Sequence, residues 1–347
     1  MRKEILFAIV AGILFGVVVA FGVWRANSAL TPNSENGETI TEPEEEAGEV
    51  GELRLAIASP SELDVITIDT VEITGVTDPN AWIAISGDVE KYIAIADDQG
   101  EFTQTVELIG GVNQLTVWSF NQKGEKESQK ITLVYSTEFE KELEDELESS
   151  GDEEVKEATE ESGAIREKVQ EKIEERRKRA KAYIGTITDI SEDTIQIKSG
   201  QGEIQQIAAS DEQTSFVKIG TKNQSLDYDE IAIGDYIIAM GFINSNDVLN
   251  ARRFLVTDPP KTATPEAYMV RVSEINDGKI TTNEISTNDE INLEVDKNTL
   301  ITVSEEGGFS EIELEDIETK STIIFIGSVE DEVLEAKRIH ITSARSS

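Results

Sequence analysis

The sequence predicts a mainly β protein that contains a Greek-key sandwich, two small closed barrels, an N-terminal transmembrane helix and a charged connecting helix. Three observations predict this fold class. Short runs of alternating apolar residues recur between turn signals over residues 53–136, a pattern typical of antiparallel strands. Residues 182–256 and 267–345 repeat each other. The stretch from Ile5 to Trp24 contains no charged residue, which is typical of a membrane span.

Residues 1–30 are predicted to form a membrane anchor. A helix from Ile5 to Trp24 is long enough to cross a hydrocarbon core of roughly 30 Å and the lipid bilayer is its expected partner. Arg2 and Lys3 precede the apolar stretch, so we expect a cytoplasmic N-terminus and a single-pass protein of the cell membrane whose bulk is extracytoplasmic. The alternative is a cleaved signal peptide, but the stretch exceeds the usual apolar region of about 7–15 residues. We therefore favour a retained anchor.

The composition excludes several classes of function. The chain has 31 Lys and Arg against 70 Asp and Glu, a net charge of -39, no Cys and a single His. Without Cys there is no disulfide, thiol nucleophile or Cys-ligated metal. With His340 alone, His-rich metal centres are excluded, and a charge this negative disfavours nucleic acid. We expect no cofactor, no catalytic residues and no enzyme activity.

The segment after the anchor divides into a linker and a β domain. Residues 31–52 carry eight acidic residues and no basic one, which predicts an acidic disordered linker. Residues 53–136 predict a sandwich of seven strands, because turn signals separate the apolar runs at regular spacing. These strands are expected at residues 53–58, 71–76, 81–86, 92–96, 102–108, 113–120 and 129–135.

Residues 53–136 resemble bacterial immunoglobulin-like domains, including the accessory domain of glucodextranases. Pro60 at the entry, a turn at Gly75, Asp-x-x-Gly-x-Phe from Asp97 to Phe102, and Gly-x-Asn from Gly111 to Asn113 carry the resemblance. It implies an immunoglobulin-like sandwich that serves as a spacer, an adhesive module or an appendage of a surface enzyme.

Two side-chain groups in this domain are candidate sites. Asp97, Asp98 and Glu101 are candidate calcium ligands, although Asp side chains and Gly100 also fit a hairpin turn, which we favour. Four aromatic residues could form a sugar platform, but alternation in strands favours core packing. These residues are Trp82, Tyr92, Trp118 and Phe120.

Residues 137–181 predict a charged helical connector. Thr137 and Glu140 form a capping box, and a basic cluster closes the segment, where it suits the C-terminus of a helix. The alternative is a short coiled coil, through which residues 137–181 would give weak self-association.

The C-terminal part is an internal repeat of two β units. Residues 182–256 form the first and 267–345 the second, and a linker at 257–266 contains three prolines. Tyr236–Gly241 (YIIAMG) aligns with residues 322–327 (TIIFIG), and VLNARRF at 248–254 aligns with VLEAKRI at 333–339. About six short strands per unit bury most surface when the sheet closes into a small barrel.

Each unit resembles the DUF5666 domains of bacteria. The first copy carries their pattern at residues 185–190, 193–195, 231–241 and 248–256. The second copy departs from it, since Val270 replaces the first Gly and Glu318-Thr319-Lys320 replaces Ile233-Gly234-Asp235. An OB-like barrel is what the resemblance implies.

The basic pairs of the two copies, Arg252-Arg253 and Lys337-Arg338, invite a functional interpretation. In a strand, one residue of each pair faces solvent and the other covers the barrel rim or meets a carboxylate. His340 aligns with Leu255. A position that accepts Leu in the sister copy is a poor catalytic candidate.

Together these features predict a membrane-anchored extracytoplasmic bacterial surface protein without catalysis. It would act as an adhesive, binding or spacer scaffold for a surface glycan or protein partner. The alternative is an accessory subunit or enzyme that acts on cell-envelope polysaccharide.

Overall fold

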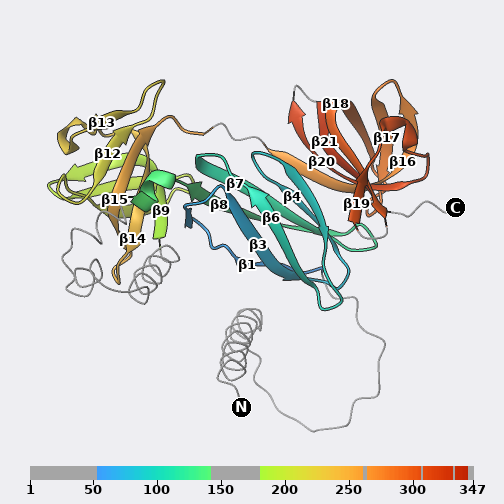
Figure 1. Cartoon of the computed structure of the whole chain (residues 1–347), viewed down its shortest axis with the longest axis horizontal. Helices are drawn as coiled ribbons and strands as arrows, with labels where there is room; N and C mark the ends of the chain where they lie inside the picture. The colour runs from blue at the N-terminus through green and yellow to red at the C-terminus, as the bar shows by residue number, and fades with distance from the viewer. Residues whose placement is uncertain (1–52, 142–179, 261–263, 306–307, 331–332, 343–347) are drawn as a thin grey trace, which may run out of the picture. The chain divides into compact units, whose positions relative to one another are not determined.

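The computed structural model describes residues 53–141, 180–260, 264–305, 308–330 and 333–342, and these residues are mainly β (Figure 1). The predicted anchor and acidic linker lie outside them, as does most of the predicted charged helix with its proposed self-association. Among the described helices, none has the length and apolar character that a membrane crossing requires.

Residues 53–136 fold as a β-sandwich of two sheets, with strand orders β1-β3-β6 and β2-β8-β7-β4-β5. The seven predicted strands are present. The prediction missed β2, because a strand of two residues shows no alternation. The strands are β1 (Leu55–Ser59), β2 (Val65–Ile66), β3 (Thr70–Thr77), β4 (Trp82–Ser86), β5 (Lys91–Ile95), β6 (Glu101–Glu107), β7 (Gly111–Phe120) and β8 (Lys126–Tyr135).

The inward side chains of both sheets form the sandwich core. Ile73, Ile83, Val106 and Leu133 are fully buried there. They alternate along their strands with residues that face outward, as a two-sheet fold requires. The three-stranded sheet turns charged and hydroxyl side chains outward, whereas the five-stranded sheet turns Trp118 and Phe120 outward, and both of these are buried.

The first repeat is a sheet that closes on itself. Its strand order is β11-β10-β9-β14-β15, and β11 also pairs with β15, so five strands form a ring to which β12 and β13 are added. The strands are β9 (Ala180–Ser191), β10 (Thr194–Ser199), β11 (Ile204–Ala208), β12 (Ser215–Lys218), β13 (Gln224–Leu226), β14 (Tyr236–Ile243) and β15 (Val248–Thr257), with the short 3-10 helix η2 (Tyr228–Glu230) before β14.

The second repeat closes in the same way, through pairing of β17 with β18. A single long strand, β18, here does what β11 and β12 do separately, since it pairs with β17 at one end and with β19 at the other. The strands are β16 (Pro265–Asn276), β17 (Lys279–Glu284), β18 (Glu290–Glu305), β19 (Gly308–Glu311), β20 (Thr322–Glu330) and β21 (Val333–Ile341), with the 3-10 helix η3 (Leu314–Asp316) before β20.

A glycine common to both repeats marks a close approach of two strands. A Cβ at Gly241 would lie 2.0 Å from the Asn250 carbonyl oxygen, and one at Gly327 would lie 2.2 Å from that of Glu335. The strand register shifts at both positions. Only glycine fits there, which explains why the aligned motifs YIIAMG and TIIFIG both end in it.

The two repeats pack against the sandwich through equivalent faces. Outward side chains of the first repeat form a buried cluster with Val65 and Val134 of the sandwich. Aligned side chains of the second repeat form another with Trp118 and Phe120. The aligned pairs are Ala182 with Ala267, Ile184 with Met269, Ile238 with Ile324, and Met240 with Ile326. Strands β14 and β20 are therefore apolar on both sides, because one side fills the barrel and the other docks.

The chain leaves the sandwich through a helical turn at residues 137–141. Ser136 caps this turn, since the Phe139 N–H donates to the Ser136 Oγ over 3.3 Å. The predicted cap at Thr137 is thus one residue too late, because the serine hydroxyl before it already accepts this bond. Phe139 is fully buried and contacts Phe242 of the first repeat.

Candidate functional site: a polar groove at the sandwich edge

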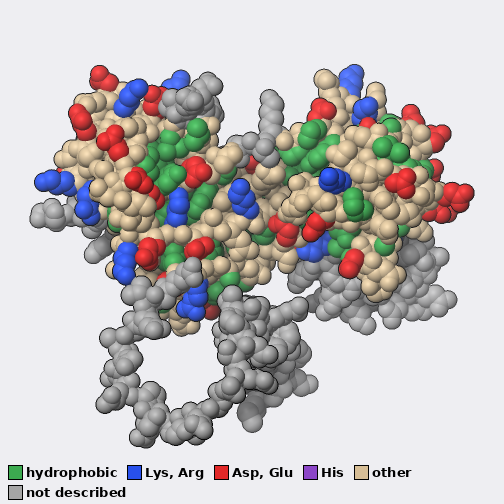
Figure 2. Space-filling view, turned by 180° about the vertical axis from the view of Figure 1, so that it is seen from behind, with side chains coloured by type: hydrophobic (Ala, Val, Ile, Leu, Met, Phe, Trp, Pro, Cys, Tyr) green, Lys and Arg blue, Asp and Glu red, His purple; other side chains and the backbone are tan. Residues whose placement is uncertain are grey.

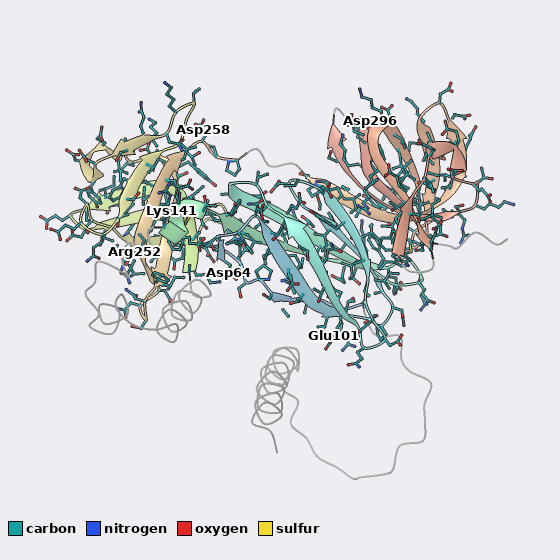
Figure 3. The ribbon with its side chains drawn as sticks, in the orientation of Figure 1. Asp64, Glu101, Lys141, Arg252, Asp258 and Asp296 are labelled. Carbon is teal, nitrogen blue, oxygen red and sulfur yellow. The ribbon has the colours of Figure 1, made fainter. Side chains whose placement is uncertain are left out.

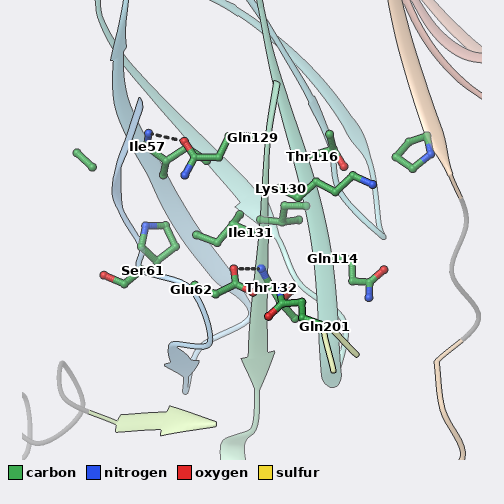
Figure 4. Close-up of a pocket in the computed structure, with 14 residues that line it drawn as sticks. Ile57, Ser61, Glu62, Gln114, Thr116, Gln129, Lys130, Ile131, Thr132 and Gln201 are labelled. Atoms are coloured by element: carbon green, nitrogen blue, oxygen red, sulfur yellow. Dashed lines mark hydrogen bonds between the residues drawn. The ribbon is translucent and has the colours of Figure 1, made fainter. Parts of the chain in front are cut away.

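The candidate site is a groove of about 570 Å³ beside strand β8 (Figure 4). Successive side chains of a strand point to opposite faces, so Gln129 and Ile131 line one side of β8, and Lys130 and Thr132 line the other. Gln201 of the first repeat and Pro265 of the second also contribute to the lining. The groove thus surrounds an exposed strand edge.

The edge is open because its neighbouring strand is short. β2 pairs with β8 only at Val134 and Tyr135. The Leu63 N–H extends this contact by donating to the Thr132 carbonyl over 2.7 Å. From Lys130 back to Lys126, the ladder partner of β8 among the described strands is β7 alone. The residues between β1 and β2 cross from one sheet to the other, so they do not pair with β8, and its edge stays open.

Two side chains of the groove are held in place by backbone groups. The Ile57 N–H donates to Gln129 Oε1 over 3.1 Å, and the Thr132 N–H donates to Glu62 Oε2 over 2.7 Å. Each of these side chains uses one polar atom in the bond. The amide nitrogen of Gln129 and the second carboxylate oxygen of Glu62 remain for a ligand.

The groove is electrically balanced in a very acidic protein. Among the described residues that line it, Glu62 and Lys130 are the ionisable ones, and their charges cancel. The remaining polar lining consists of neutral amides and hydroxyls: Ser61, Gln114, Thr116, Gln129, Thr132 and Gln201. The visible face of the molecule mixes acidic and basic side chains (Figure 2). The groove therefore suits an uncharged polar ligand better than a cation.

The predicted calcium candidates form a hairpin turn. Asp97 Oδ1 accepts hydrogen bonds from the backbone N–H groups of Gln99 and Glu101 at 2.8 and 2.9 Å. Gly100 has a φ of 83° and completes the turn, and Glu101 lies at one end of the sandwich strands (Figure 3). No group of three or more Asp, Glu or His side chains within the described ranges could hold a metal ion.

His340 is a buried packing residue. Its Nδ1 lies 2.9 Å from Thr302 Oγ1 and its Nε2 lies 3.1 Å from Ser304 Oγ. Its ring centroid lies 5.0 Å from that of Trp82 and 4.4 Å from that of Phe309. Burial, followed by the nearby positive charge of Arg338, lowers the pKa of His340 to about 4. A neutral imidazole whose two nitrogens both have hydrogen-bond partners fits a packing role for this residue.

Of the four aromatic residues considered for a sugar platform, two are buried and two are partly exposed. Trp118 and Phe120 are buried against the second repeat, so they cannot form a sugar platform. Trp82 is half-buried and stacks on Phe309, with ring centroids 6.5 Å apart. Tyr92 is half-buried, and its hydroxyl accepts a hydrogen bond from the Glu107 N–H over 2.9 Å. Packing explains all four.

The basic pair of the second repeat, Lys337-Arg338, has structural partners. Lys337 Nζ lies 2.7 Å from Glu335 Oε2, and Arg338 Nη1 donates to the Lys91 carbonyl over 2.8 Å. The second contact joins the second repeat to the sandwich, a role that the sequence did not predict. At the other junction Lys181 Nζ lies 2.7 Å from Asp64 Oδ1. Both junctions thus pair an apolar face with a basic side chain that reaches the sandwich.

These features define a mainly β protein in which two repeats are docked on a sandwich with a polar groove. No family model matches the chain, and no curated protein matches it. The motif resemblances to immunoglobulin-like and DUF5666 domains therefore stay predictions from sequence.

Several solved structures are similar to parts or most of the chain. A carbohydrate acetylesterase from Xanthomonas citri is 22% identical over 23% of this chain and 19% of its own, with a TM-score of 0.19. A tetra-tandem repeat from the extending region of a large adhesion protein is 8% identical over 83% and 73%, with a TM-score of 0.21. A Ca2+-stabilized adhesin of an Antarctic bacterium is 10% identical over 87% and 76%, with a TM-score of 0.18. Scores this low carry no argument about fold or function.

Proposed function

We propose that the chain is a membrane-anchored, extracytoplasmic and non-catalytic scaffold of a bacterial surface, whose β modules space and bind. The apolar stretch from Ile5 to Trp24 with Arg2 and Lys3 before it supports the anchor and its orientation. The net charge of -39 supports a role in a solvated surface layer, since it keeps the exposed modules soluble.

The proposal includes the identity of the modules. The parallel pairing of β2 with the last sandwich strand, β8, supports an immunoglobulin-like sandwich, with β7 and β4 next in order. The ring order β9-β10-β11-β15-β14, closed by a parallel contact between β11 and β15, supports an OB-like barrel for each DUF5666-like repeat. Shape alone does not imply nucleic-acid binding.

The docking of both repeats through equivalent faces is the observation that carries the scaffold function. Separate modules on flexible linkers would leave these faces polar, whereas Met240 and Ile326 are fully buried in the two contacts. Burial of several such side chains at each contact opposes hinge motion, since each contributes about 1.5–3 kcal/mol. A stiff three-module body holds the binding surfaces of its modules in a fixed arrangement relative to one another.

Two undocking variants test the stiffness. I326D and M240D place a carboxylate in a buried apolar contact, so we expect a larger radius of gyration by X-ray scattering and faster proteolysis between the modules. I243D is the matched control, because Ile243 lies on the same strand as Met240 but is 38% exposed. Unchanged scattering in both buried variants would contradict the docked scaffold.

The topology is tested with single cysteines, because the chain contains none. A membrane-impermeant maleimide should label S347C in intact cells and K3C only after lysis. Labelling of K3C in intact cells, or release of the protein into the medium, would refute the anchor. Hydrolysis of a cell-envelope polysaccharide by the purified chain would instead favour the alternative function as an enzyme or enzyme subunit.

A further inference from the structure

We propose that the groove beside β8 binds an uncharged, hydroxyl-rich saccharide. This inference rests on the proposed surface function and names the ligand class of its groove. Sugar hydroxyls both donate and accept hydrogen bonds, and so do the amides and hydroxyls that form most of the polar lining. A volume of about 570 Å³ falls within the range of about 300–1,000 Å³ that is usual for ligand pockets.

The charges of the groove favour a neutral ligand over an acidic or a basic one. Glu62 and Lys130 cancel, and Glu62 is already committed to the Thr132 N–H. Within the described lining an anionic polymer would meet Lys130 as its cation, and long-range repulsion from a protein of net charge -39 would oppose its approach. A cation would find a single carboxylate, which is too few oxygen ligands for calcium.

The polar groups are arranged before any ligand arrives. Gln129 is fixed by the Ile57 N–H and Glu62 by the Thr132 N–H, so both lose little conformational entropy on binding. Gln114 lies exposed in the lining, and its backbone N–H is held by Asp88 Oδ2 over 3.0 Å. Leu115 and Ile131 also border the groove, but their side chains are buried in the sandwich core, so polar groups supply most of its accessible surface.

The mode of recognition sets the expected affinity. The described lining residues include no aromatic ring, so hydrogen bonds rather than stacking would select the ligand. Such bonds compete with water, and each contributes little net free energy. We therefore expect dissociation constants on the order of 1 mM for a short oligosaccharide, with tighter binding of a surface that presents many copies.

The test measures saccharide binding by the full chain in a zwitterionic detergent whose headgroup contains no sugar. Maltohexaose, cellohexaose and N-acetylated chitohexaose are the neutral probes, and an oligogalacturonate is the anionic probe. We expect at least one neutral probe to bind the parent chain. Its affinity for Q114L and for Q129L should be about tenfold lower, which corresponds to the loss of one or two hydrogen bonds. Q114L removes an amide that makes no hydrogen bond within the described residues, so it separates ligand contact from folding.

Two control variants complete the design. Gln206 is an exposed glutamine on β11 outside the groove, so Q206L should bind within about twofold of the parent chain. K130Q should also stay within about twofold, because a neutral ligand needs no ammonium group. Failure of every neutral probe, unchanged binding by Q114L, or preference for the oligogalacturonate that K130Q abolishes would overturn the proposal. The scattering and labelling experiments do not involve the groove, so their results judge the scaffold function separately.

Discussion

Replacing His340 with Leu should remove a pH-dependent part of the stability. His340 is fully buried, and desolvation, followed by the charge of Arg338, lowers its pKa from 6.5 to about 4. Between these values the unfolded chain binds a proton that the native chain does not. The neutral His340 therefore makes its full contribution to native-state stability above pH 6.5, and this contribution is lost as the pH falls toward 4.

The size of the effect follows from the two pKa values. A shift from 6.5 to about 4 corresponds to about 3 kcal/mol in total, at 1.36 kcal/mol for each pH unit. Between pH 7 and pH 5, about 2 kcal/mol of it should be lost. Denaturant unfolding of the parent and H340L at both pH values measures it. The parent should lose about 2 kcal/mol more than the variant.

The comparison of parent with variant isolates His340 from other acid effects. The 70 carboxyl groups titrate in both proteins and cancel in the difference. At pH 7 H340L loses two hydrogen bonds of about 1 kcal/mol each but adds apolar burial against Trp82. Its pH 7 stability should thus change little. Equal pH dependence in the two proteins would refute the assignment of a buried neutral imidazole.

Three further predictions concern stability. G241A should lower the free energy of unfolding by about 3 kcal/mol, because its Cβ would meet the Asn250 carbonyl. G200A, whose Cβ would lie in open space, should change it by less than about 0.5 kcal/mol in thermal unfolding. Equal losses in the two variants would contradict the close approach at Gly241. D97A should lower stability by about 1 kcal/mol through loss of its turn hydrogen bonds, and added calcium should not shift the melting temperature of the parent; a calcium-dependent shift that D97A removes would restore the metal interpretation. L255H should lower the free energy of unfolding by about 2 kcal/mol. L255H/V217T should recover about 1 kcal/mol of this loss, because a hydroxyl then lies opposite the imidazole. A double variant no more stable than L255H would refute that pairing.

Much of the fold could be predicted because local patterns agree with it. The alternation of apolar residues located seven sandwich strands, and the repeat located matching strands in both copies. β2 escaped prediction because Val65 and Ile66 form a strand only through the parallel contact with β8. No local pattern encodes a pairing with residues so distant in sequence.

The docking of the repeats was missed, although the sequence contained a signal for it. YIIAMG and TIIFIG are apolar without alternation, and a strand of that kind is buried on both faces. The groove left no such signal. Gln114 and Gln129 are ordinary exposed residues of their strands, and they share a site because β2 begins only opposite Val134 and leaves the preceding β8 edge open.

The aligned positions around His340 differ in polarity between the two copies of the repeat. His340 pairs with Thr302 across β21 and β18, whereas Leu255 pairs with Val217 across β15 and β12. A histidine alone in the apolar setting would bury two unsatisfied nitrogens, which costs about 1–3 kcal/mol for each group. With the Thr302 and Ser304 hydroxyls in place, both nitrogens are satisfied within the repeat itself. The imidazole can therefore face Trp82 without any polar partner from the sandwich, and packing explains its position.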